Sequence, residues 1–329
     1  MGYRSAALSG LAFGALLVNA ASKPVLWSDP GPVERLDLSS GPGGDALRPQ
    51  PPFRFLREMA GGTNRKLEVR DARGIIWRVK FGAENRSDAF SSRVAWACGY
   101  YADPIHIVPE GRIEGVHGLG RAKRSVKQDG SFRHAVMETT ERRYRYMAHR
   151  SWAWNQNPFV GTHELNGLKI VMMLVSNWDN KDIRDEKNNG SNLGMLEETR
   201  GRRKSTIFYV NDWGESLGSW GRHNITHDRW NCAEFSGQSI DFVKGVRDGH
   251  VQFGFSGQHT EDFMSDITVD DVRWIMKYLG RIQDAQLLAG LRAAGADEKE
   301  AACFAGELRA RIGQLLYLIK TTPKAVSRR

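Results

Sequence analysis

Alternating apolar and polar positions predict a β-hairpin early in the chain. The runs Lys66–Arg70 and Ile75–Phe81 have a period of two and flank the turn sequence Asp-Ala-Arg-Gly. In the second run Trp77 and Val79 fall on the apolar face, and Lys80 falls on the other face. We therefore expect a half-buried strand that presents a lysine on the side away from its core.

Helical periodicity predicts a helix over residues 87–101, where apolar residues recur every three or four positions. Further strands are expected at 105–109, 115–120 and 132–139, and amphipathic helices at 268–279, 285–294 and 297–320. A strand-rich part followed by a helical part is typical of an α+β fold.

Two apolar runs are each followed by a short polar segment that contains an aspartate. Ile170–Val175 leads into Asn-Trp-Asp, which ends at Asp179, and Ile207–Val210 leads into Asn-Asp-Trp-Gly, which contains Asp212. Each run can be buried as a helix or a strand and can deliver its carboxylate at the polar end. Because Mg²⁺ usually takes one or two carboxylates together with substrate phosphates, this pattern predicts a cation site that bridges phosphates.

The two acidic segments resemble the catalytic loop and the metal-binding turn of the protein-kinase-like superfamily. The resemblance is closest to its atypical branch, which includes HipA-type, phosphoinositide and secretory-pathway kinases. The VKFG, NWD and D-x-G segments also look like those of a group of exported bacterial proteins. The resemblance implies a two-lobed fold, transfer of a nucleotide γ-phosphate to a hydroxyl acceptor, and bound ATP (or another nucleotide) with Mg²⁺ or Mn²⁺.

The resemblance assigns roles to the second half of the candidate site by position. Asp179 and Lys181 would act in catalysis, and Asp212 would bind the metal. Asn188 or Asn189 would complete the metal site. They lie nine and ten residues after Asp179, whereas the corresponding asparagine of the family lies five residues after the catalytic aspartate. An insertion in this loop explains the longer spacing.

The resemblance also assigns the nucleotide-binding residues. Gly61 and Gly62 would form the glycine turn over the phosphates, and Lys80 would bind the phosphates. Asp88 or Glu84 would pair with Lys80 from the following helix. The alternative for Lys80 is a solvated strand lysine, and the alternative for Asp88 is a helix cap.

The N-terminal residues predict export. Arg4, an uncharged apolar run and small residues before position 21 are typical of a signal peptide over 1–20. We therefore expect a periplasmic or extracellular protein with no membrane segment after cleavage. The expected domains are the signal peptide 1–20, an irregular Pro/Gly-rich arm over 21–52, an N-lobe over 53–150 and a C-lobe over 151–322.

The remaining sequence features leave alternatives open. The stretch 188–204 is expected to be an exposed, basic, Gly-rich loop. Three cysteines allow one disulfide with one free thiol, or three buried thiols; no C-x-x-C spacing supports a redox motif or structural zinc.

Charge and composition leave three functions open. The chain has 329 residues, 40% hydrophobic and 26% charged, which is typical of a globular protein, and a net charge of +9. Basic clusters at 121–124, 142–145 and 200–204 attract anions, but no RNA-binding signature accompanies them, so no specific nucleic acid is expected. The first function is an exported kinase whose acceptor is a protein, a sugar or a small metabolite. The alternatives are an inactive pseudokinase used as a binding or scaffold module, and a basic surface that binds an anionic polymer.

Overall fold

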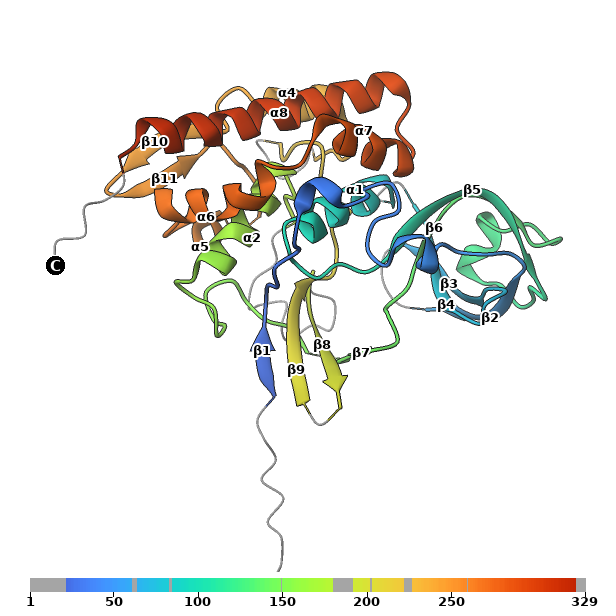
Figure 1. The fold of residues 1–329 in the computed structure, drawn as a ribbon. Coiled ribbons are helices and arrows are strands. Elements are labelled where there is room, and N and C mark those ends of the chain that lie inside the picture. The colour runs from blue at the N-terminus through green and yellow to red at the C-terminus, as the bar shows by residue number, and fades with distance from the viewer. Residues whose placement is uncertain are drawn as a thin grey trace, which may run out of the picture.

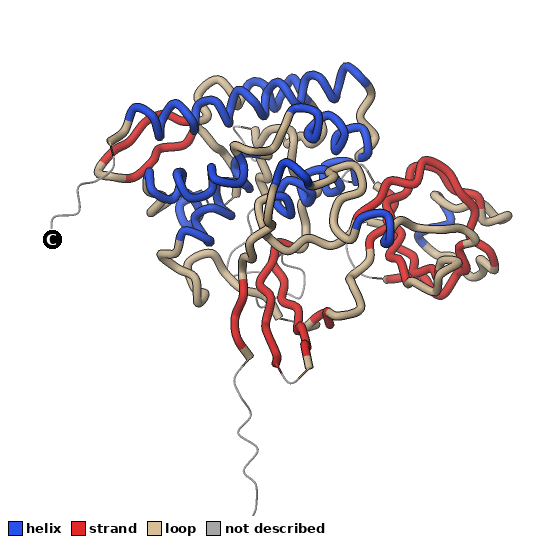
Figure 2. The backbone as a smooth tube through the Cα atoms, in the orientation of Figure 1, coloured by secondary structure: helices blue, strands red, loops and turns tan. Residues whose placement is uncertain are grey.

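The computed structural model describes residues 22–60, 64–82, 85–148, 150–179, 192–201, 203–221, 227–258 and 260–323, without the side chains of 261 and 262. It is a mixed α+β structure in which a strand-rich part precedes a mainly helical part (Figures 1 and 2). No helix among these residues has the length and apolar character needed to cross a membrane.

The strand-rich part is a closed five-stranded barrel with the order β2-β3-β4-β6-β5. Its strands are β2 (Phe53–Met59), β3 (Arg65–Arg70), β4 (Ile76–Phe81), β5 (Ile105–Glu114) and β6 (Ser131–Glu138). The β3–β4 hairpin is the one predicted from the sequence, with Leu67 opposite Val79 and both side chains fully buried in the barrel. Parallel pairing of β2 with β5 closes the barrel.

The strand expected at 115–120 is absent. Instead β5 extends to Glu114, and the chain then turns through Gly115 and Gly118, whose φ angles are 72° and 62°. Glycine accepts this left-handed backbone without the steric cost of a Cβ, and a strand does not contain it. The turn leads into the short 3₁₀ helix η3 (Arg121–Arg124).

Helix α1 (Asn85–Ala97) connects β4 to β5 and lies between the barrel and the helical part (Figure 1). Almost every side chain of α1 is buried, including the polar side chains of Asp88 and Arg93. The helix ends four residues earlier than predicted because Gly99 has a φ of 93° and terminates it.

A second, four-stranded sheet has the order β1-β9-β8-β7. Its strands are β1 (Lys23–Val25), β7 (Tyr144–Tyr146), β8 (Leu193–Arg200) and β9 (Arg203–Val210). The prediction of an exposed loop over 188–204 is therefore wrong for its described part, since β8 and β9 form an antiparallel hairpin. In β8 the buried apolar side chains are those of Leu193 and Leu196, and two glutamates follow Leu196 directly. The sequence therefore shows no alternation of apolar and polar residues that would predict a strand.

The helical part consists of α2, α4, α5, α6, α7 and α8 with the hairpin β10–β11 (Figure 2). Their bounds are α2 His163–Leu174, α4 Cys232–Gly237, α5 Thr260–Met264, α6 Val269–Leu279, α7 Asp284–Ala293, α8 Glu298–Thr321, β10 Val243–Arg247 and β11 His250–Phe253. The last three helices match their predicted positions closely. Capping boxes at Thr268 and Asp297 start α6 and α8.

One disulfide joins the helical part. Cys232 of α4 is bonded to Cys303 of α8, and Cys98 is a buried free thiol. Of the two alternatives that the sequence left open, the structure has one disulfide with one free cysteine. A cross-link that closes a loop of this length stabilises the fold mainly by restricting the unfolded chain.

The segment expected as an irregular arm is packed against the rest of the chain. Besides β1 it contains the 3₁₀ helices η1 (Val33–Arg35) and η2 (Gly44–Leu47). Leu26, Val33 and Leu38 are at most 2% exposed and belong to the main hydrophobic core. Isolated apolar residues among prolines and glycines give no periodic signal, so their burial was not visible in the sequence.

Candidate functional site

Lys80 lies near the end of β4, where it forms ion pairs with two carboxylates. Its Nζ is 3.2 Å from Asp88 Oδ2 of α1 and 2.5 Å from Glu138 Oε2 of β6. The expected contact between Lys80 and an acid of the following helix is present, and Asp88 provides it. Burial alone would lower the pKa of Lys80, but the neighbouring carboxylates, Glu138 first, raise it, so the amine stays protonated.

Glu138 is the main anion of this cluster, and sequence reasoning missed it. Its carboxylate also pairs with Arg78, which lies 3.3 Å from Asp103. Burial would raise the pKa of Glu138, but Arg78 and Lys80 hold it at about 2. A single glutamate at a strand end matches no motif. Its position opposite Arg78 follows from the β4–β6 register, which only the fold defines.

Asp88 joins the Lys80 cluster to the segment that contains Asp212. Its Oδ1 accepts a hydrogen bond from the backbone N–H of Trp213 at 3.2 Å. Burial is the largest cause that raises the pKa of Asp88, and with the negative charges of Asp212 and Glu138 it brings this pKa to about 6 against the opposing effect of Lys80. The carboxylates here outnumber the cations that contact them, so a proton or a cation near Asp88 is favourable.

The raised pKa of Asp88 predicts a pH-dependent stability. Between the ordinary pKa of 3.8 and about 6, the native state retains a proton that the unfolded chain has lost. The contribution of this carboxyl is therefore present below about pH 4 and is lost as the pH rises through about 6, by on the order of 2–3 kcal/mol. Asp88→Asn should remove this part of the profile in melting curves recorded from pH 4 to 7.

The matched control is Asp248→Asn, because Asp248 is exposed and has a φ of 53°, which asparagine also adopts readily. Its pH profile should follow that of the wild type. An Asp88→Asn profile parallel to the wild-type profile over the same range contradicts the prediction.

Asp212 lies two residues after the end of β9 and faces the same cluster. Its Oδ1 accepts the backbone N–H of Gly214 at 2.9 Å, and its main-chain oxygen accepts a hydrogen bond from Asn177 Nδ2 at 3.2 Å. The hydrogen bond from the N–H of Trp213 to Asp88 brings the neighbouring Asp212 to this cluster, and the negative charge of Asp212 raises the pKa of both Lys80 and Asp88. The structure thus brings together Lys80, Asp88 and Asp212 from three separate elements.

Asp179 lies in the loop that follows α2, and this loop is paired with the segment after Asp212. The N–H of Trp178 donates to the carbonyl of Glu215 at 3.0 Å. Asn192 Nδ2 donates to Asp179 Oδ2 at 2.7 Å and to its main-chain oxygen at 2.8 Å. The carbonyl of Asn192 accepts the N–H of Asn211 at 2.7 Å, so one residue connects Asp179 to the neighbour of Asp212.

Asn192 is a candidate metal ligand that sequence reasoning missed. Asn188 and Asn189 lie outside the described residues, and so does Lys181. Because the Nδ2 group of Asn192 is used by Asp179, its Oδ1 is left as a hard oxygen donor. The signal in the sequence was an asparagine directly before the buried Leu193 that begins β8.

The donor set fits a cation that takes few protein ligands. No three His, Cys, Asp or Glu side chains in the described ranges gather to hold a metal ion. Asp212 and Asn192 supply one carboxylate and one amide oxygen, and Mg²⁺ commonly completes such a site with water and substrate phosphates. The predicted glycine turn, Gly61 and Gly62, and the alternative acid Glu84 lie outside the described residues.

Lys66 is a second cation that sequence reasoning missed. It stands directly opposite Lys80 in the β3–β4 register, so the two side chains share one face of the barrel. Lys66 forms no ion pair with a described residue. Burial and the positive charge of Lys80 lower the pKa of Lys66.

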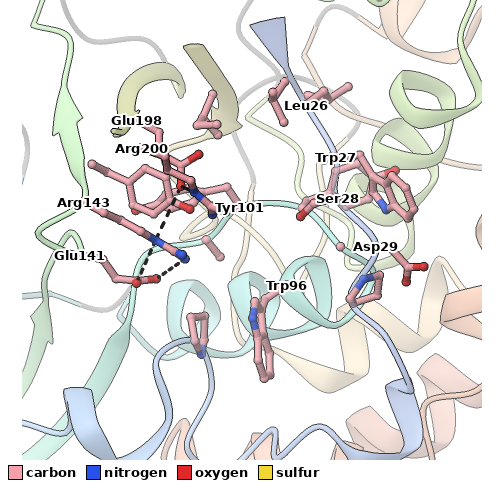
Figure 3. Close-up of a pocket in the computed structure, with 18 of the residues that line it drawn as sticks. Leu26, Trp27, Ser28, Asp29, Trp96, Tyr101, Glu141, Arg143, Glu198 and Arg200 are labelled. Atoms are coloured by element: carbon pink, nitrogen blue, oxygen red, sulfur yellow. Dashed lines mark hydrogen bonds and ion pairs between the residues drawn. The ribbon is translucent and has the colours of Figure 1, made fainter. Parts of the chain in front are cut away.

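A separate cavity of about 310 Å³ is lined by none of Lys80, Asp88, Asp179 and Asp212 and is not part of this site (Figure 3). Tyr101 lines it and donates a hydrogen bond to Asp103 at 2.7 Å. Its charged residues are Asp29, Glu141, Arg143, Glu198 and Arg200, and both arginines pair with the two glutamates. The cavity therefore has no unpaired cation for a phosphate among its lining residues as described.

Comparisons with known proteins give only distant structural matches. No family model matches the chain, and no characterised protein matches its sequence. A proinflammatory kinase of Helicobacter pylori, CtkA, is similar in structure with a TM-score of 0.46 and 12% identity over 80% of this chain and 93% of that one. The Golgi casein kinase with Mn/ADP bound is similar with a TM-score of 0.38 and 9% identity over 91% of this chain and 78% of that one.

Proposed function

We propose that the protein is an exported kinase-like phosphotransferase that transfers the γ-phosphate of ATP or another nucleotide to a hydroxyl acceptor with Mg²⁺ or Mn²⁺. The strand-rich barrel and the helical part would act as the two lobes, with the nucleotide between them. The observation that carries the proposal is the connection of Lys80, Asp88 and Asp212, together with the Asn192 bridge from Asp179.

The roles follow from charge and position. Lys80 and Lys66 present two amines on one barrel face, and these would neutralise nucleotide phosphates as charge develops on the transferred group. Asp88 and Glu138 hold the Lys80 amine in a fixed position. Positioning and electrostatic stabilisation supply most of the catalysis in phosphoryl transfer, so fixed cations are the part that a protein must build.

Asp179 is the residue that would contact the hydroxyl group of the acceptor. Its carboxylate is held by Asn192 Nδ2, and in this orientation it would accept a hydrogen bond from the acceptor hydroxyl and take its proton. A divalent cation at Asp212 and Asn192 would neutralise phosphate oxygens. The acceptor class stays open among protein, sugar and small metabolite.

Export is supported by the N-terminal pattern and by the Cys232–Cys303 disulfide. Disulfides persist in oxidising compartments and are rare in the reducing cytosol. We propose a periplasmic or extracellular location for the protein after its signal peptide is removed.

The test is thermal stabilisation by nucleotide. A ligand that binds only the native state raises its stability by mass action, so ATP or GTP with Mg²⁺ or Mn²⁺ should raise the melting temperature. Lys66→Gln should reduce the shift, because it removes one phosphate-facing cation that has no described partner. Lys277→Gln, an exposed lysine on α6, is the control and should leave the shift unchanged.

The outcome also separates the alternatives. Stabilisation by the nucleotide without transfer to any acceptor would indicate a pseudokinase. If no nucleotide shifts the melting temperature of the wild type in either metal, the phosphotransferase proposal is wrong.

A further inference from the structure

A groove of about 980 Å³ opens where the start of β3, the end of β4 and the β5–β6 connection meet. We call it the basic groove, and its cations are Arg65, Arg112, Lys123, Arg124, Lys127 and Arg133. Glu110 is the one carboxylate among its lining residues as described. A hollow with this excess of positive charge attracts and concentrates anionic partners.

None of the six cations of the basic groove forms an ion pair with a described residue. Arg65 Nη1 donates to the hydroxyl of Ser125 at 2.9 Å, and Arg112 Nε donates to the carbonyl of Asp129 at 2.8 Å, so both contacts are with neutral oxygens. Elsewhere surface arginines such as Arg57 and Arg292 pair with glutamates. The groove therefore holds more positive charge than its one lining carboxylate, Glu110, balances.

The backbone that carries these cations is fixed in place. Glu58 at the end of β2 accepts the N–H groups of Gly120 and Ala122 at 2.5 and 2.8 Å, which anchors the start of η3. Ala122 is fully buried, and the N–H of Lys127 donates to the carbonyl of Ser131 at 2.9 Å. Since the loop is already ordered, an anionic partner pays little conformational entropy when it binds.

The arrangement of the cations favours an acidic protein segment over a nucleic acid. They come from several chain segments and all line one hollow, which suits a short acidic segment. Phe81 and Phe132, the phenyl rings that line the groove, are only 6% and 4% exposed, and His134 is the one exposed ring among its lining residues. The groove thus lacks the series of exposed aromatic rings on which successive bases stack when single-stranded nucleic acid binds.

We propose that the basic groove is a docking site for a carboxylate-rich segment of a protein partner. Arginine and lysine side chains on the rim would form charge-assisted hydrogen bonds with its Asp and Glu side chains. The inference does not depend on phosphotransferase activity, because docking requires neither nucleotide nor metal.

The test is binding of a fluorescein-labelled peptide of alternating Glu and Gly, followed by anisotropy without nucleotide or metal. The triple variant Lys123→Glu/Arg124→Glu/Lys127→Glu should bind at least about tenfold more weakly than the wild type. The matched control Lys277→Glu/Lys299→Glu/Lys320→Glu changes the net charge equally at exposed helix positions outside the groove. It should bind within about twofold of the wild type, because distant exposed charges are screened by salt.

Two outcomes overturn the proposal. Equal weakening in both triple variants means that only net charge attracts the peptide. Tighter binding of a labelled oligothymidine of matched charge, lost in the groove variant, means that the groove takes nucleic acid instead. The neutral variant Lys123→Gln/Arg124→Gln/Lys127→Gln avoids new repulsion, and it too must weaken peptide binding while its melting temperature stays at the wild-type value.

Discussion

Asp179→Asn should leave nucleotide binding nearly intact and lower the rate of phosphate transfer by about 10²- to 10⁴-fold, the usual contribution of a general base. Asparagine keeps the shape of the side chain and the hydrogen bond with Asn192 is still possible, but it cannot take the proton of the acceptor hydroxyl. Asp212→Ala should instead abolish metal-dependent nucleotide binding, because it removes the carboxylate proposed as the metal ligand.

The two variants should differ in their effects on binding and transfer because the two carboxylates have different neighbours. Asp179 lies in the loop after α2 and is held by Asn192, whereas the charge of Asp212 acts on Lys80 and Asp88. Binding is measured by calorimetry with Mg²⁺ and transfer by release of nucleoside diphosphate in the presence of acceptor. Asp248→Asn, an exposed acid in a turn, is the control for both measurements. If both site variants bind and turn over like the wild type, the two acids are structural.

Local patterns in the sequence were enough to predict the β3–β4 hairpin and the pairing of Lys80 with Asp88. Both depend on short-range rules. A period of two places Trp77 and Lys80 on opposite faces, and the helix that follows the strand begins only a few residues later, so its first turn lies near the strand end. The same reasoning placed a carboxylate after each apolar run, although it did not decide that Ile170–Val175 belongs to a helix and Ile207–Val210 to a strand.

The site residues that the sequence did not predict reach the site only because particular strands pair with one another. Glu138 reaches Lys80 because β6 pairs with β4, although β5 lies between them in the sequence. Lys66 gains its position only through the register with Lys80, and Asn192 only through the pairing of β8 with β9. Periodicity within a segment carries no information about these partners, since strand pairing is set by burial of the whole sheet.

The disulfide shows the same limit for covalent contacts. Three cysteines and their spacing left the pairing open, and the choice of Cys232 with Cys303 follows from the packing of α4 on α8. Cys98 directly follows α1 and is fully buried. Burial raises the pKa of its thiol, so the thiol stays protonated. It has no role in the candidate site.

The largest effect on stability is expected at Arg311, a fully buried arginine of α8. Its guanidinium lies 3.7 Å from the ring centroid of Phe235, and burial lowers its pKa to about 9. It donates five hydrogen bonds of 2.8 to 3.2 Å, to the carbonyls of Met173, Leu174 and Phe235 and to the hydroxyls of Ser176 and Ser239. Two of these carbonyls end α2, directly before the loop that carries Asp179.

Arg311→Met should therefore destabilise the protein by about 3–5 kcal/mol, because it leaves several buried acceptors without a donor at once. Arg309→Met is the matched control on the same helix: its partly exposed side chain pairs with the exposed carboxylate of Asp284, and its loss should cost about 1 kcal/mol or less. Urea unfolding of both variants, with the disulfide intact, measures the difference.

Because the end of α2 positions the Asp179 loop, Arg311→Met should also lower the transfer rate at temperatures where the variant remains folded, while Arg309→Met should not. Equal unfolding free energies for the two variants would show that the carbonyls find other donors, and that Arg311 holds neither the helix end nor the loop.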